Sequence, residues 1–130
     1  MLALVKTQKG EGFLELQEVP EPVNAEDEVL IEVKAAGICG TDIHVKHDTF
    51  PYWPPVILGH EFSGQIVKVG SQVKGWKVGD RVGLSPMMSD GQALGYFDWD
   101  GGFAPKLLAT DDNLVRLPDE VGFDLGAMAT

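Results

Sequence analysis

The chain has 130 residues, of which 44% are hydrophobic, so it has room for one globular domain with a single core. Ten basic and twenty acidic residues give a formal net charge of −10, which opposes binding to nucleic acid phosphates or to an anionic membrane surface. No apolar run approaches the ~20 residues that cross a bilayer, and the first residues lack the pattern of a secretory signal, so we expect a cytoplasmic protein whose partners are small molecules.

The first third of the chain alternates apolar and polar residues as β-strands do. We expect strands at residues 2–5, 13–19 and 28–36, with a hairpin connection at residues 10–12. Residues 20–27 hold two prolines and a polar run, which are typical of irregular structure.

The rest of the chain is rich in β-branched residues and contains little helix. Further strands are predicted at residues 64–70, 80–84, 103–109 and 113–117. A short helical turn is expected at residues 41–46, and residues 118–130 have the pattern of a helix. Short strands at such close spacing predict a mainly β protein, either a barrel or a sandwich.

Two short segments concentrate the chemically reactive side chains. Residues 37–44 (GICGTDIH) contain Cys39, and residues 55–62 (PVILGHEF) contain His60 and Glu61. Since Cys39 is the single cysteine, an internal disulfide is excluded. Zinc accepts thiolate, imidazole and carboxylate ligands, and a catalytic zinc site uses three protein ligands with one open position.

Each of these residues also has a simpler interpretation when it is taken alone. A single cysteine is more often buried packing than a metal ligand, and Glu61 alone would be a solvated charge. Neighbouring strand residues point to opposite faces, so His60 and Glu61 reach one metal only if the backbone bends between them. Gly59 makes that bend plausible.

The two segments together resemble the zinc-dependent medium-chain alcohol dehydrogenase family, whose catalytic domain is a GroES-like β-barrel with short helical turns. The resemblance extends to residues 78–82 (VGDRV) and 101–104 (GGFA). The Glu that directly follows the His makes this segment similar to the corresponding segment of the sorbitol and threonine dehydrogenases. The resemblance implies that residues 1–130 form one zinc-binding catalytic domain. The nucleotide-binding Rossmann domain would lie outside them, since no Gly-x-Gly-x-x-Gly follows a strand.

The resemblance also implies roles for individual residues at the metal. Cys39 and His60 would be zinc ligands, and Glu61 would be a ligand that alternates with water. Asp42 would accept a hydrogen bond from an imidazole and so fix its tautomer.

A second pair of residues is implied to move the substrate proton. Thr41 stands where the family passes that proton toward solvent, and His44 would be the outer member of the relay. The reaction would be oxidation of a secondary alcohol or polyol by NAD or NADP, with zinc polarising the hydroxyl. We expect residues 1–130 alone to be inactive, and to self-associate through the surface that the nucleotide-binding domain would cover.

The chain departs from the family pattern at one important place. Related dehydrogenases often carry a lobe with four cysteines that holds a second, structural zinc. Residues 85–96 stand in that place and contain no cysteine, so one zinc site and no structural zinc are expected.

Two other functions are compatible with this type of barrel. The first is a non-catalytic GroES-like binding module, and the second is a zinc-free domain of the quinone reductase type. Neither has a use for Cys39 and His60. An aromatic run at Phe50, Tyr52 and Trp53 is compatible with either a substrate pocket or loop packing.

Overall fold

The computed structural model describes residues 1–88, 90–97 and 99–128. Antiparallel strands form two sheets, in the orders β2-β1-β4 and β7-β3-β5-β6-β8. In chain order the elements are β1 (Leu2–Lys6), β2 (Leu14–Glu18), β3 (Val29–Gly37), α1 (Gly40–Lys46), β4 (Val56–Ile57), β5 (Glu61–Val69), β6 (Arg81–Leu84), β7 (Lys106–Ala109), the 3-10 helix η1 (Asp111–Asn113), β8 (Leu114–Arg116) and α2 (Phe123–Met128).

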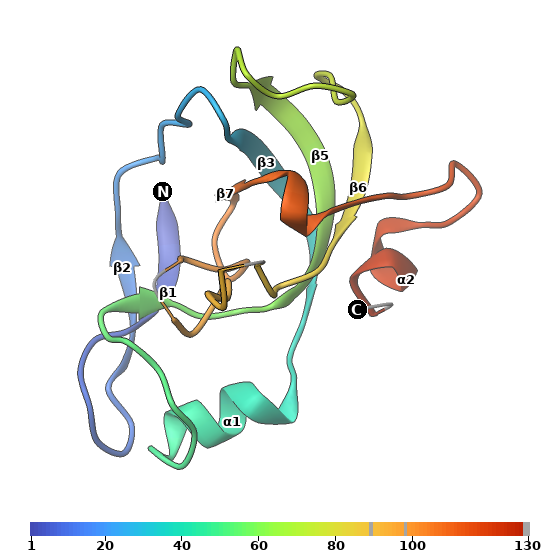
Figure 1. Cartoon of the computed structure of the whole chain (residues 1–130). Coiled ribbons are helices and arrows are strands. Elements are labelled where there is room, and N and C mark those ends of the chain that lie inside the picture. The colour runs from blue at the N-terminus through green and yellow to red at the C-terminus, as the bar shows by residue number, and fades with distance from the viewer. Residues whose placement is uncertain (89, 98, 129–130) are drawn as a thin grey trace.

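The core lies along the inner face of the larger sheet. Its central strands contribute almost fully buried side chains, among them Val29 and Ile31 on β3, and Phe62 and Ile66 on β5. Helix α1 lies at one end of the molecule, and α2 lies beside β6 on the side away from β1 and β2 (Figure 1). Neither helix, within the described part of the chain, is long and apolar enough to cross a membrane.

The pairing of β3 with β5 brings the end of β3 next to the start of β5. Two register shifts interrupt this pairing, one between Leu30 and Ile31 and one between Val33 and Ala35. Such β-bulges bend a strand and re-aim its side chains. Beyond the second shift the last residue of β3, Gly37, stands opposite the first residue of β5, Glu61.

A buried lysine joins β1 to the C-terminal end of α1. Lys6 has no exposed surface, and its Nζ donates to the carbonyl oxygens of Gly10 at 2.5 Å, Gly12 at 2.5 Å and Lys46 at 3.4 Å. The Gly12 N–H donates to the same Lys46 carbonyl. Since Lys46 ends α1, these bonds fix the helix against the β1–β2 hairpin.

The predicted mainly β architecture is confirmed, and each predicted strand overlaps an observed one. Strand β4 was not predicted, because its two residues follow two prolines and pair only with distant β1. The predicted helix start at residue 118 is wrong: α2 begins at Phe123. A turn precedes it, in which Arg81 donates to the carbonyls of Pro118 and Val121. Residues 129 and 130, the end of that prediction, lie outside the described residues.

Candidate metal centre

Cys39 lies at the N-terminus of α1. It is the N-cap residue, with φ −91° and ψ 157°, and its Sγ accepts a hydrogen bond from the Thr41 N–H at 3.5 Å. The pKa of the thiol is held below its ordinary value by the Thr41 backbone N–H first, then by the Thr41 hydroxyl and the His60 ring. A partly exposed thiol with a lowered pKa is prepared to act as a thiolate ligand.

His60 follows a backbone bend at Gly59, where φ is +102°. A Cβ at Gly59 would lie 2.8 Å from the backbone nitrogen of Phe103, so both the torsion and the packing require glycine here. The bend places His60 just before β5 with only 7% of its surface exposed.

Glu61 begins β5 and turns its carboxylate over the opposite strand. A Cβ built on Gly37 would lie 3.0 Å from Glu61 Oε2, so the missing side chain at Gly37 leaves room for this carboxylate. Gly37 is two residues before Cys39, which is why the Glu61 carboxylate comes close to the thiol.

The structure brings Cys39, His60 and Glu61 together. The thiol sulfur, one ring nitrogen and one carboxylate oxygen all lie within 4.8 Å of one another. Zinc bonds of about 2.0–2.3 Å in a tetrahedral site would place such atoms roughly 3.3–3.7 Å apart. Side-chain shifts of about 1 Å would therefore close the three donors around one ion.

Asp42 touches both of the first two candidate ligands. Its side chain is 6% exposed, Oδ2 accepts from the Cys39 N–H at 2.9 Å, and Oδ1 lies 3.4 Å from His60 Nδ1. That second contact is close enough for electrostatic attraction but lacks hydrogen-bond geometry, so Nδ1 is buried without a hydrogen-bond partner among the described residues. Burial alone would lower the His60 pKa, but Asp42 and Cys39 outweigh it and raise the pKa.

The donor set fits zinc. It combines a thiolate-prone sulfur, a buried imidazole with a carboxylate beside Nδ1, and a second carboxylate. With Nδ1 facing Asp42, the other ring nitrogen, Nε2, is the one available for a metal.

The two predicted relay residues are placed differently. The Thr41 hydroxyl is 3.6 Å from Cys39 Sγ, so Thr41 belongs to the same cluster. His44 is exposed one turn later on α1, and its Nδ1 is 3.3 Å from the Thr49 hydroxyl. The relay from Thr41 to His44 stays a prediction.

Tyr96 is a neighbour of this cluster that was not predicted. Its ring packs edge-on against the His60 ring, with centroids 5.1 Å apart and planes at 90°. Burial, followed by the charges of Cys39 and Asp42, raises the pKa of its phenol. An aromatic residue in a loop without regular pattern gives no sequence signal that would separate this contact from packing.

The three aromatic residues at positions 50–53 lie in different environments. Phe50 packs edge-on against Tyr96 at 5.4 Å, and Tyr52 is buried in the core. Trp53 is 57% exposed. Phe50 is therefore the one that joins the surroundings of the cluster.

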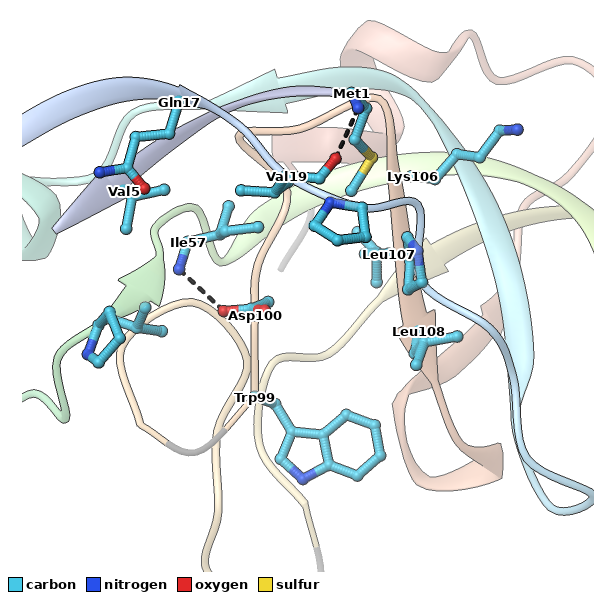
Figure 2. A pocket seen from close by; sticks show the side chains of 14 residues that line it. Met1, Val5, Gln17, Val19, Ile57, Trp99, Asp100, Lys106, Leu107 and Leu108 are labelled. Carbon is cyan, nitrogen blue, oxygen red and sulfur yellow. Dashed lines mark hydrogen bonds between the residues drawn. The ribbon is translucent and has the colours of Figure 1, made fainter. Parts of the chain in front are cut away.

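A cavity of about 450 Å³ lies elsewhere in the molecule, between β1, β2, β4 and β7 (Figure 2). Its wall is mainly apolar, with Val5, Ile57 and Leu107 among the residues that line it. Asp100 is its carboxylate, and Oδ1 already accepts from the Ile57 N–H at 2.9 Å. None of the six predicted site residues lines this cavity, so it lies apart from the cluster of Cys39, His60 and Glu61.

Comparisons with known proteins find relatives of this chain. Residues 25–119 match the family model described as alcohol dehydrogenase GroES-like domain. The chain is 41% identical to a sorbitol dehydrogenase of Halalkalibacterium halodurans, over 98% of this chain and 42% of that protein. It is 32% identical to an (R,R)-butanediol dehydrogenase of Bacillus subtilis, over 88% of this chain and 40% of the relative.

Solved structures show the same similarity in three dimensions. A Sinorhizobium meliloti protein described as a zinc-binding dehydrogenase, bound to NADP, superposes with a TM-score of 0.89 and 31% identity, over 98% of this chain and 41% of that one. The 2R,3R-butanediol dehydrogenase of Bacillus subtilis gives 0.87 and 30%, over 98% and 43%. The predicted GroES-like fold is confirmed, and the chain spans about two fifths of the length of these relatives.

Proposed function

Because the chain belongs to the alcohol dehydrogenase GroES-like domain family, we propose that it is the zinc-holding catalytic domain of an NAD- or NADP-linked dehydrogenase. The substrate would be a secondary alcohol or a polyol, the classes to which the sorbitol and butanediol dehydrogenase relatives point. The nicotinamide would be held outside residues 1–130, because these contain no Gly-x-Gly-x-x-Gly after a strand. Residues 1–130 alone would then be inactive.

The convergence of Cys39, His60 and Glu61 within 4.8 Å carries the proposal. Three protein donors leave one position of a tetrahedral metal for substrate, as catalytic zinc sites require. A protein-binding module or a zinc-free reductase has no need of this donor set. The match of residues 25–119 to the family model points in the same direction.

The side chains around the metal have distinct tasks in this proposal. A zinc ion supplies Lewis-acid chemistry that lowers the pKa of an alcohol hydroxyl. Asp42 holds the Cys39 backbone with one oxygen and attracts His60 Nδ1 with the other, so one carboxylate orients two ligands. Thr41 presents a hydroxyl beside the thiol, where it would accept the substrate proton and pass it toward His44.

Zinc stoichiometry tests the proposal on the chain itself. After zinc loading and desalting, elemental analysis should find about one zinc per chain. Cys39→Ser and His60→Ala should each lose most of it, because each removes one of three donors. His47→Ala is the matched control, since His47 pairs with Glu11 at the surface away from the cluster. Equal zinc in the wild type and in Cys39→Ser would contradict the proposed site.

Activity is tested in a fusion that restores a dinucleotide site. Joining residues 1–130 to the nucleotide-binding part of the sorbitol dehydrogenase relative should give oxidation of a polyol or secondary alcohol. His60→Ala in that fusion should remove nearly all turnover, whereas His44→Ala should mainly slow proton release and shift the pH profile. Full turnover in the His60→Ala fusion would refute the assignment.

A further inference from the structure

His60 Nδ1 has no hydrogen-bond partner among the described residues. That nitrogen lies 3.4 Å from Asp42 Oδ1 without hydrogen-bond geometry. The torsion that turns a histidine ring has broad minima, so the backbone does not fix the ring either. A ligand nitrogen has to point at its metal to within about 10–20°. Asp42 attracts Nδ1 but does not by itself define the plane of the ring, so a second contact has to contribute to its orientation.

Tyr96 makes that contact. The two rings meet edge to face, with centroids 5.1 Å apart and planes at 90°. This arrangement is a preferred one for aromatic pairs and opposes rotation of either ring. Asp42 and Tyr96 thus restrain the His60 ring from two different elements, α1 and the loop before β7.

Tyr96 is itself held rigidly. Its ring packs edge-on against Phe50 at 5.4 Å and against Phe97 at 4.8 Å. Its hydroxyl lies 3.7 Å from Met87 Sδ, and its carbonyl accepts from the Trp53 N–H at 2.8 Å. Only 9% of the residue is exposed. These contacts hold the Tyr96 ring in one position, from which it can restrain the His60 ring.

The backbones that carry the two rings also pack against each other. A Cβ on Gly95 would lie 2.4 Å from the Gly59 carbonyl oxygen, so the chain before Tyr96 touches the chain before His60 directly. Gly95 has φ +91° and its N–H donates to the Trp99 carbonyl at 2.9 Å. The two glycines therefore set the distance between the rings that follow them.

We propose that Tyr96 is a positioning residue that fixes the His60 imidazole for metal binding through its ring, and that its hydroxyl is dispensable for this. The inference rests on the proposed zinc site. It gives a role to Tyr96, the last residue of the cysteine-free segment 85–96: its ring supplies an aromatic contact to a proposed metal ligand.

Cobalt(II) binding tests the inference without any need for activity. Affinity is measured by competition with a chelator, and the visible d–d and thiolate-to-metal bands report the ligand geometry. Tyr96→Met and Tyr96→Leu, two ring-free variants, should weaken binding about 10-fold or more and alter these bands. Tyr96→Phe keeps the ring and should stay within about 2-fold of the wild type.

The control separates positioning from general loss of packing. Tyr52→Met removes a tyrosine from the same buried cluster, and the ring contacts described for Tyr52 do not include His60. It should lower the unfolding midpoint while affinity and spectrum stay unchanged at a temperature where the chain is folded. Wild-type affinity and bands in either ring-free variant would overturn the inference alone. Failure of the wild-type chain to bind one cobalt would overturn the zinc site as well.

Discussion

Replacement of Gly59 by alanine tests the bend that places His60. At φ +102° an L-residue is strained by about 1–2 kcal/mol. The new Cβ would also lie 2.8 Å from the Phe103 nitrogen, which is backbone and cannot swing away. Two hydrogen bonds are at risk, from the Gly102 N–H to the Gly59 carbonyl and from the Phe103 N–H to the Leu58 carbonyl. At about 0.5–1.5 kcal/mol each, they add about 1–3 kcal/mol.

Gly79→Ala is the matched control. Gly79 has φ +95°, yet a Cβ there would meet nothing within 4 Å. The control therefore carries the strain of about 1–2 kcal/mol without the collision. Urea unfolding followed by tryptophan fluorescence measures both variants. With an m-value of about 2 kcal/mol/M, the midpoint of Gly59→Ala should lie about 0.5–1.5 M below that of Gly79→Ala. Coincident midpoints would refute the packing argument.

Three further predictions concern individual polar contacts. Asp42→Asn should weaken zinc binding about 10–100-fold in chelator competition, because the charge beside His60 Nδ1 is lost; unchanged affinity would contradict this role. Asp48→Asn should lower stability at neutral pH: the Tyr52 hydroxyl holds the Asp48 pKa below its usual value, so the carboxylate stabilises the fold above about pH 4. The difference from wild type should shrink as pH falls in urea unfolding, and a constant difference would argue against it. Lys6→Met should lower the free energy of unfolding by about 2–4 kcal/mol in the same assay, because it removes the donor from the partly buried carbonyls of Gly10 and Gly12; a loss below about 1 kcal/mol would refute that.

The parts of the fold that were predictable are those that local pattern determines. The strand at residues 28–36 alternates clearly and appears as Val29–Gly37. Strand β4 has only two residues and therefore no local pattern. It forms because it pairs with β1, which is far away in the sequence. The helix start was misplaced because Arg81, 37 residues earlier than Pro118, fixes the turn before it.

The candidate site was predictable for a different reason. Cys39, His60 and Glu61 were singled out by residue type and by resemblance, not by geometry. Their approach depends on the register of two strands and on the missing side chain at Gly37, neither of which a pattern of hydrophobicity reveals. Tyr96 was not predicted because its contact with His60 is purely tertiary.

The register of β3 against β5 has a consequence for folding kinetics. The three donors become neighbours only when Gly37 and Glu61 stand opposite each other, and a slip by one residue would turn the Glu61 side chain to the other face of the sheet. Cobalt binding at the proposed site would therefore report one long-range pairing event, the closure of β3 on β5. In a stopped-flow refolding experiment, the rise of a thiolate-to-cobalt band would time the closure of this strand pair, separately from the collapse that tryptophan fluorescence follows.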